Sequence, residues 1–285
     1  MLKQISLVSC LGLVAACGGS GGGGGSMTMN PPTAAQYTPL TNRMSVQSDV
    51  VGVAYVDSLG RISTAPNIFD TQDEQYITVS GTFDHATGTA RLSRDGTVVT
   101  ATADSQALQG RDLGLYRYSG VSNQFLVRDP ADPDNNDIAQ SSQVVFGIPT
   151  RDADMPTTTT ALYQGDAVIT YQTDDSFSGI RSDAIVSANF AAGRVTVAIV
   201  PESTQDDDPF DRFERRNMII DGSSFRGGFA RFTLDGKAVN PTGTTQSSFA
   251  RGEFFGPVDA EPAEVGGMIR VTGSDAEVTA TFIAR

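Results

Sequence analysis

The sequence predicts an all-β protein made of two antiparallel β domains. Beyond about residue 48, strand candidates and turns follow one another at short, regular intervals. No segment of useful length shows the apolar period of an amphipathic helix. Residues 161–171 and 277–284 alternate between apolar and polar side chains, which is the pattern of antiparallel sheets that pack on one face. These observations favour antiparallel sheets over helical or mixed folds.

The first half, residues 49–149, is expected to form an antiparallel sheet. Residues 94–97 read Arg-Asp-Gly-Thr, and an Asp-Gly step commonly closes a tight hairpin, so residues 89–93 and 98–103 are predicted to be its arms. A polar connector that ends at Pro156 separates this half from the second. The remaining strand candidates of this half cover residues 50–56, 75–83, 113–119, 124–128 and 143–148.

The second half, residues 150–285, is predicted to form an eight-stranded antiparallel β-barrel. Eight strands are enough to close a barrel whose interior is filled by side chains, and closure removes exposed sheet edges. The alternation has apolar exceptions at Leu162, Val168 and Ile283. The candidate strands cover residues 161–171, 184–190, 194–200, 217–221, 225–234, 246–255, 264–272 and 277–284. The bulky side chains expected to fill the interior are Tyr163, Ile169, Tyr171, Phe190, Phe229 and Phe282.

Residues 1–16 have the proportions of a signal peptide. A short positive start is followed by an apolar run of about 12 residues, which is roughly 18 Å as a helix and too short to span a bilayer. The run ends in Val14-Ala15-Ala16-Cys17, which resembles the lipobox of bacterial lipoproteins. That resemblance implies cleavage before Cys17 and a lipid on its thiol. The alternative is an ordinary signal peptide in which Cys17 is incidental.

Residues 17–48 are predicted to be a flexible, lipid-anchored arm. The Gly-rich run after Cys17 cannot pack and gives a tether with a reach of about 15–18 Å. A domain held by a lipid needs such a tether, which favours the lipoprotein interpretation. In lipoproteins, retention in the inner membrane usually depends on an aspartate after the cysteine. Gly18 stands there, so the resemblance implies the outer membrane.

Composition excludes several classes of function. A formal net charge of −13 disfavours nucleic acid as a partner. The only cysteines are Cys10, which leaves with the signal peptide, and Cys17, so we expect no disulfide, thiolate metal site or cysteine nucleophile. His85 is the one histidine and lies in a predicted hairpin loop, where it is either solvated or a haem ligand or proton shuttle. We expect no catalytic residues, no metal site, no cofactor and no enzymatic activity.

Two acidic segments are the exposed candidates for binding. Residues 129–137 begin like a calcium loop at Asp132, but Asp137 and Gln143 stand where that loop needs glycine and glutamate. Residues 204–211 continue into Glu214 and three arginines, which predicts a charged loop. That loop is either a solvated connection or a surface that docks a partner, and paired glycosidase carboxylates remain open. Its weak ligand-binding candidates are Asp206, Asp207, Asp208 and Asp211.

Residues 145–285 resemble the β-barrel domain of transferrin-binding protein B-like surface lipoproteins. The resemblance begins with Met155-Pro156 and continues through Ala161-Leu162-Tyr163-Gln164-Gly165 and Ala188-Asn189-Phe190. It is most specific in the closing segments, which are Gly252-Glu253-Phe254-Phe255-Gly256-Pro257, Glu264-Val265-Gly266-Gly267 and Ala280-Thr281-Phe282-Ile283-Ala284-Arg285. The glycines at 252 and 256 are expected where a strand bends or another backbone comes close, and only one of Phe254 and Phe255 can face the barrel core.

The resemblance implies a binding lipoprotein. The first half would then correspond to the family's variable handle region. Members of the family bind host or environmental proteins, haem or host regulators, so we expect a protein, haem or other solute ligand, in that order. This chain has room for one lobe where transferrin-binding members have two, so iron capture from transferrin is not carried over. The alternative is a structural lipoprotein of the envelope without a soluble ligand, and the protein would face either the cell surface or the periplasm.

Overall fold

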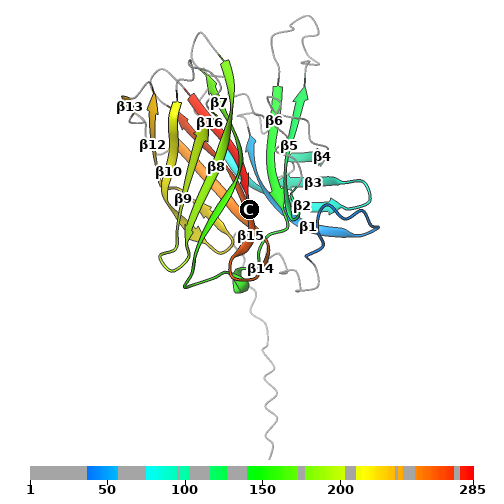
Figure 1. Ribbon diagram of the computed structural model, residues 1–285. Helices are drawn as coiled ribbons and strands as arrows, with labels where there is room; N and C mark the ends of the chain where they lie inside the picture. The colour runs from blue at the N-terminus through cyan, green and yellow to red at the C-terminus, as the bar shows by residue number, and fades with distance from the viewer. Residues whose placement is uncertain are drawn as a thin grey trace, which may run out of the picture. The chain divides into compact units, whose positions relative to one another are not determined.

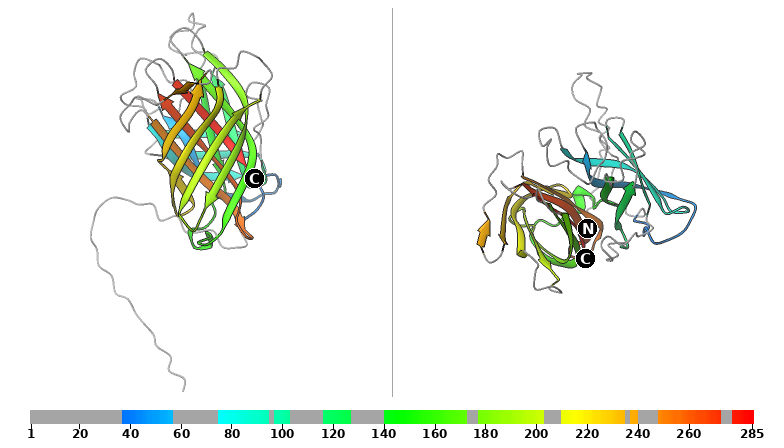
Figure 2. Two further views of the ribbon diagram at one scale, coloured as in Figure 1. Left: turned by 60° about the vertical axis from the view of Figure 1, so that its left-hand side comes forward. Right: turned by 90° about the horizontal axis from the view of Figure 1, so that it is seen from above.

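The computed structural model describes residues 37–56, 75–94, 97–102, 116–126, 140–172, 177–202, 210–234, 237–239, 248–272 and 277–285. These residues form a six-stranded antiparallel sheet and a closed eight-stranded antiparallel barrel (Figure 1). The predicted all-β class, with a sheet domain before a barrel, is therefore confirmed. Seen from above in Figure 2, the barrel strands form a ring and the sheet lies along one side of it.

The sheet has the strand order β4-β3-β2-β1-β6-β5. Its strands are β1 (Gln47–Val56), β2 (Gln75–Asp84), β3 (Thr89–Arg94), β4 (Thr97–Thr102), β5 (Ser119–Leu126) and β6 (Gln140–Gly147). The predicted pairing of the hairpin arms is confirmed, because β3 and β4 pair from Thr89 with Thr102 to Arg94 with Thr97, while Asp95 and Gly96 lie outside the described residues. The predicted strand at 113–119 is wrong over residues 116–118, which precede β5 and are not in a strand.

The barrel strands pair in the order β14-β15-β16-β7-β8-β9-β10, and β11 closes the ring because it pairs with both β10 and β14. The ring consists of β7 (Thr160–Gln172), β8 (Phe177–Asn189), β9 (Arg194–Pro201), β10 (Phe210–Asp221), β11 (Ser224–Arg226), β14 (Ser248–Val258), β15 (Pro262–Thr272) and β16 (Glu277–Ala284). Two further strands, β12 (Phe229–Leu234) and β13 (Lys237–Val239), extend the sheet beyond β10.

The predicted single strand at 225–234 is wrong, because it is divided into β11 and β12. Gly227 and Gly228 stand between the two and have φ angles of 79° and 72°, a left-handed conformation that ends the extended run. The two pieces pair with different parts of β10: Phe225 lies opposite Ile220, whereas Phe229 lies opposite Arg216. The short β11 thereby closes the ring by pairing with the C-terminal end of β10, whereas β12 pairs with the N-terminal half of β10.

Aromatic and aliphatic side chains fill the barrel interior. Phe254 is central, with its ring centroid 5.2 Å from that of Phe225, 5.3 Å from that of Phe190 and 6.2 Å from that of Tyr163. Four of the six side chains predicted to fill the barrel do so, namely Tyr163, Ile169, Phe190 and Phe282. The prediction for Phe229 is wrong, because the neighbouring Ala230 faces inward and Phe229 is 53% exposed. The side chain of Tyr171 lies outside what the structure describes.

A second core lies between the sheet and the outer face of the barrel. From the barrel it takes Val168, Phe255, Met268 and Ile283, all buried outside the ring. The sheet contributes Val50, Val53, Val121, Val144, Val145 and Phe146, among others. The apolar exceptions at Val168 and Ile283 therefore mark the barrel surface that the sheet covers, while Leu162 remains exposed. Among the described residues, no helix is long and apolar enough to cross a membrane.

Candidate functional site

A buried carboxylate on the barrel holds the beginning of β5. Glu264, in β15, accepts hydrogen bonds from the backbone N–H groups of Arg117 (2.9 Å) and Tyr118 (3.0 Å) and from the Ser119 hydroxyl (2.6 Å). Burial raises the pKa of Glu264, and the three donors act in the opposite direction because they stabilise the ionised form. One carboxylate of the barrel thereby fixes residues 117–119 against it.

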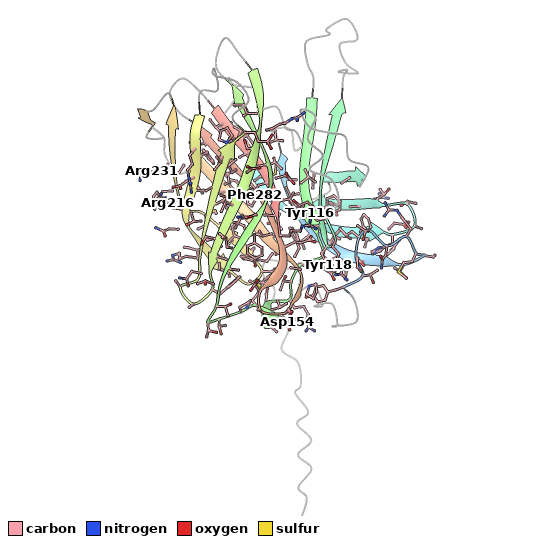
Figure 3. The ribbon with its side chains drawn as sticks, viewed as in Figure 1. Tyr116, Tyr118, Asp154, Arg216, Arg231 and Phe282 are labelled. Atoms are coloured by element: carbon pink, nitrogen blue, oxygen red, sulfur yellow. The ribbon has the colours of Figure 1, made fainter. Side chains whose placement is uncertain are left out.

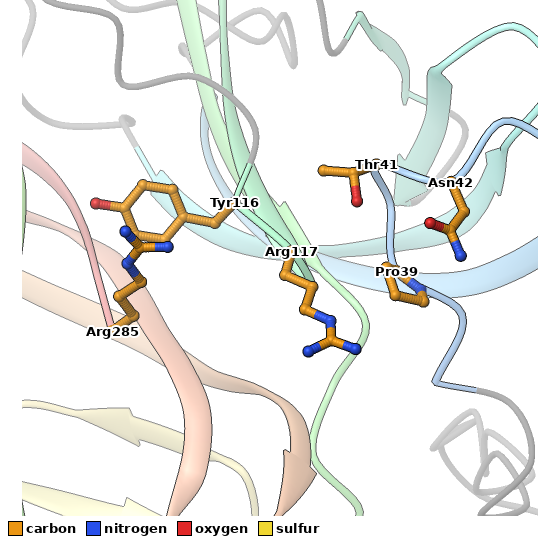
Figure 4. A pocket seen from close by; sticks show the side chains of 6 residues that line it. All are labelled: Pro39, Thr41, Asn42, Tyr116, Arg117 and Arg285. Atoms are coloured by element: carbon orange, nitrogen blue, oxygen red, sulfur yellow. The ribbon is translucent and has the colours of Figure 1, made fainter.

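Beside this carboxylate lies an open groove with a volume of about 590 Å³. Residues that lead into the sheet form one wall, residues that lead into β5 form another, and Arg285, which follows β16, forms a third (Figure 4). The lining residues are Pro39, Thr41, Asn42, Tyr116, Arg117 and Arg285. We refer to these six residues as the junction groove.

Aromatic rings hold the two guanidinium groups of the junction groove. The Arg285 Cζ lies 5.5 Å from the centroid of the Tyr116 ring, and the Arg117 Cζ lies 5.1 Å from that of Tyr118. The Tyr116 hydroxyl donates to Asp166 Oδ2 at 3.0 Å, and burial together with that carboxylate raises the pKa of Tyr116. Because cation–π contacts orient Arg117 and Arg285 without occupying their N–H donors, both groups can bind an anion.

The carboxylates of the described residues leave both groove arginines available. Neither Arg117 nor Arg285 forms an ion pair within the part of the chain that the structure describes. In a chain with a net charge of −13, these two exposed guanidiniums give the groove cationic groups beside the carboxylates of Asp166 and Glu264. The ligand group that fits them is a carboxylate or another planar anion, which an arginine fork binds through two parallel hydrogen bonds.

His85 is buried, which corrects the expectation of a solvated loop histidine. Its Nδ1 donates to the Asn42 carbonyl oxygen at 3.2 Å, and its Nε2 then accepts from the Ser48 hydroxyl at 2.8 Å. Its ring meets that of Phe83 edge to face, with the centroids 4.9 Å apart. The histidine thus anchors the segment before β1 to the β2–β3 turn. Both ring nitrogens are engaged, so neither is available to a haem iron.

A second buried carboxylate lies at the seam where β11 closes the barrel. Glu253, in β14, accepts from the Ser223 hydroxyl, and the Ser223 N–H donates to Asp152 Oδ1 at 2.9 Å. Burial, together with the nearby Asp152 carboxylate, raises the pKa of Glu253 to about 7. Within the described ranges, no three His, Cys, Asp or Glu side chains lie close enough together to hold a metal ion.

The ligand-binding candidates from the sequence fall largely outside the described residues. This holds for Asp206, Asp207 and Asp208 and for residues 129–137. Asp211 lies in β10, and its side chain is not described. The charged loop expected through residue 216 is wrong from residue 210 onward, because Arg212, Glu214, Arg215 and Arg216 all lie in β10.

Sequence reasoning missed the junction groove. The segment Tyr116-Arg117-Tyr118 alternates aromatic and cationic residues, but it lies inside a predicted strand and so attracted no functional interpretation. The sequence analysis identified Arg285 only as the last residue of a segment that resembles the family's closing strand. Its approach to Tyr116 depends on how the sheet packs on the barrel, and no local pattern in the sequence reports that packing.

The fold consists of an antiparallel barrel with a sheet packed on its outer face, and the barrel matches a family model. Residues 155–285 match the model described as the C-lobe and N-lobe beta barrels of Tf-binding protein B. The expected resemblance is thereby confirmed. No curated protein matches the chain.

The solved structures that match the chain share little sequence with it. Intact Ap-TbpB, with its N and C lobes, is 18% identical with a TM-score of 0.45, and the match covers 83% of this chain and 46% of that one. The Tyr-167-Ala and Trp-176-Ala double mutant of transferrin binding protein B from Haemophilus parasuis is 16% identical with a TM-score of 0.49, covering 84% and 45%. HpuA from Kingella denitrificans, solved with human haemoglobin, is 15% identical with a TM-score of 0.38, covering 90% and 93%. The chain spans less than half the length of the first two.

Proposed function

We propose that this protein is a lipid-anchored binding protein of the outer membrane that takes a protein ligand on its outer surface. The match of residues 155–285 to the barrel model of Tf-binding protein B supports a binding role. The lipobox-like segment that ends at Cys17 and the Gly-rich run after it support anchoring through a lipid. The structures to which the chain is similar include a transferrin binding protein B and HpuA in complex with human haemoglobin, which favours a protein over a small solute.

The filled barrel interior is the observation that carries this proposal. Tyr163, Phe254 and Phe282 are buried at its centre, with aliphatic side chains around them. An eight-stranded barrel leaves room only for its own side chains or for one small ligand, and here the side chains occupy it. A ligand therefore docks on the outside, either on loops or on the surface between sheet and barrel.

The junction groove is the best-defined outer site. Its two arginines need no reorganisation to meet a carboxylate, because Tyr116 and Tyr118 already orient them. We propose that the junction groove binds acidic side chains of a protein ligand. Haem, whose propionates are carboxylates, and other anionic solutes rank second and third.

Binding assays with the full chain in detergent test this function. Transferrin, haemoglobin and free haem serve as probes, and the chain is compared with its Arg117→Gln/Arg285→Gln variant. We expect a protein probe to bind and the double variant to weaken it roughly tenfold. Arg194→Gln is the matched control, because Arg194 is an exposed arginine of β9 whose guanidinium donates to the Gly193 carbonyl oxygen at 3.1 Å.

Two results would change the assignment. Stoichiometric binding of haem without binding of either protein would move the solute ligand to first place. If neither these probes nor a pull-down from host fluids yields a ligand, the structural envelope lipoprotein becomes the better description.

A further inference from the structure

A cluster of arginines lies on the outer surface of the barrel, on β10 and β12. In the register of these strands Glu214 lies opposite Arg231, and Arg216 lies opposite Phe229, so the four side chains share one face. Arg212, two residues before Glu214, belongs to the same face. We define the arginine face by these five residues. Figure 3 shows Arg216 and Arg231 on the side of the barrel away from the six-stranded sheet.

Among the described residues, the carboxylates that pair with the arginine face are fewer than its arginines. Glu214 is almost buried and binds both Arg212, at 2.6 Å, and Arg216. These two arginines are still 50% and 41% exposed. Arg231 is exposed and forms no ion pair within the described part of the chain. Three guanidiniums thus surround one carboxylate in a chain whose net charge is −13.

An exposed aromatic ring lies among these charges. Phe229 is 53% exposed although its neighbour Ala230 packs in the barrel core. Strand β9, on the other side of β10, places the small Ala198 opposite Glu214. Arginine and aromatic residues are enriched among the residues that contribute most of the binding energy in protein–protein interfaces.

We propose that the arginine face is a docking surface for a second protein, one that presents carboxylates around an apolar side chain. This interface lies beyond the proposed ligand site, because the junction groove and the arginine face share no residue. Arg231 meets a carboxylate in fork geometry, and Phe229 packs on the apolar centre. The partner needs only a local acidic patch. An anionic bilayer, in contrast, presents negative charge everywhere, and the net charge of the chain opposes its approach.

The test uses the full chain in detergent and a labelled peptide with four glutamates around a central leucine. Fluorescence anisotropy measures binding at low and at physiological salt. We expect binding that weakens with salt, a loss of roughly threefold or more in Arg231→Gln, and roughly tenfold in Arg231→Gln/Phe229→Ser. Because Arg231 forms no ion pair with the described residues, its substitution breaks no ion pair of that part of the fold, and thermal unfolding should be nearly unchanged.

Controls separate the arginine face from general electrostatics. Arg226→Gln removes a similarly exposed arginine whose charge Asp221 already neutralises at 3.3 Å, and it should bind the peptide as the unsubstituted chain does. A peptide with glutamines in place of glutamates should not bind. Equal binding by Arg231→Gln and the unsubstituted chain would overturn the proposal.

Two other occupants of the face are outcomes of the same test. If vesicles rich in phosphatidylglycerol bind through Arg231 while the peptide does not, the face is a lipid contact. If the peptide binds only after Asp206, Asp207 and Asp208 are changed to asparagine, the chain's own acidic segment occupies the face. Either result contradicts docking of a second protein, and neither depends on whether the junction groove binds its ligand.

Discussion

Phe254 and Phe255 are adjacent in β14 and are buried in two different cores. Phe254 faces into the barrel, where its ring lies among those of Tyr163, Phe190 and Phe225. Phe255 points outward into the core that the barrel shares with the sheet, and its backbone forms a bridge with Pro149. A single strand thus contributes one ring to barrel closure and the next to sheet packing.

Replacing each phenylalanine by alanine should therefore damage a different part of the molecule. Both changes remove a fully buried ring and should cost about 3–5 kcal/mol of unfolding free energy. In Phe255→Ala, hydrogen exchange should accelerate in β1 and β6 first, because their cover is lost while the barrel core stays intact. In Phe254→Ala the barrel strands should exchange first. Identical exchange patterns in the two variants would contradict the separation into two cores.

The barrel itself, as a fragment of residues 150–285, is predicted to fold without the sheet. Its interior core is built from its own strands, so the circular dichroism spectrum should be strand-dominated. The fragment would expose Val168, Phe255, Met268 and Ile283, and we expect it to bind a hydrophobic dye and to self-associate. A helix-rich spectrum, or folding only after residues 49–149 are added, would refute the two-domain division.

The apolar residues that break the strand alternation indicate which surface of the barrel is covered, and the alternation alone does not. The inward-facing residues of 161–171 were predictable because burial has period two in a half-packed sheet. Val168 and Ile283 break that pattern, and both lie under the sheet. An apolar residue on the outward side of a barrel strand therefore predicts a covered surface. Leu162, which is exposed, shows why one such residue is not enough.

The candidate site was less predictable than the fold, because it depends on long-range pairs. Arg285 meets Tyr116, and Glu264 meets residues 117–119, across separations of more than a hundred residues. Neither pair leaves a local pattern. His85 shows the same limit: its loop position indicated solvation, but Ser48, in β1, and Asn42, in the segment before β1, form hydrogen bonds with the two nitrogens of its buried ring.

Tyr163 offers a test of how the barrel core is stabilised. Its hydroxyl is buried without a hydrogen-bond partner among the described residues, and burial raises its pKa. Tyr163→Phe removes that unsatisfied group and should leave the free energy of unfolding unchanged or raise it by about 1 kcal/mol. Tyr163→Ala should lower it by a few kcal/mol, as large-to-small core changes do. Denaturant unfolding measures both; a strongly destabilised phenylalanine variant would mean that the hydroxyl has a function in the core.

The lipid anchor is predicted to depend on Cys17 alone. Cys17→Ser should abolish acyl labelling and release the protein from membranes, since each buried methylene contributes roughly 0.8 kcal/mol to anchoring. Fractionation after a high-salt wash measures the release, and Cys10→Ser, within the predicted signal peptide, is the matched control. A Cys17→Ser protein that still sediments with the outer membrane would be held by something other than the lipid.

The closure of the barrel at β11 should depend on pH through Glu253. In the folded protein the pKa of Glu253 is raised from 4.5 to about 7, chiefly because the carboxyl is buried. A raised pKa means that folding favours the protonated form. Below about pH 4.5 the group is protonated in both states and contributes no pH dependence. As the pH rises toward 7, the unfolded chain ionises first, and the folded state progressively loses relative stability; above pH 7 the loss is complete.

Glu253→Gln should remove this loss while keeping an oxygen that accepts from Ser223. The variant should gain stability over the unsubstituted chain between pH 5 and 8, by on the order of a few kcal/mol at the alkaline end, because one pKa unit corresponds to about 1.4 kcal/mol. Melting temperatures of the two proteins across this range measure the difference, with the exposed Glu261→Gln as control. A difference that stays constant with pH would show that Glu253 keeps an ordinary pKa. A difference that grows with pH, together with faster hydrogen exchange in β11 of the unsubstituted chain, would place the sensitivity at the seam that Ser223 and Asp152 hold.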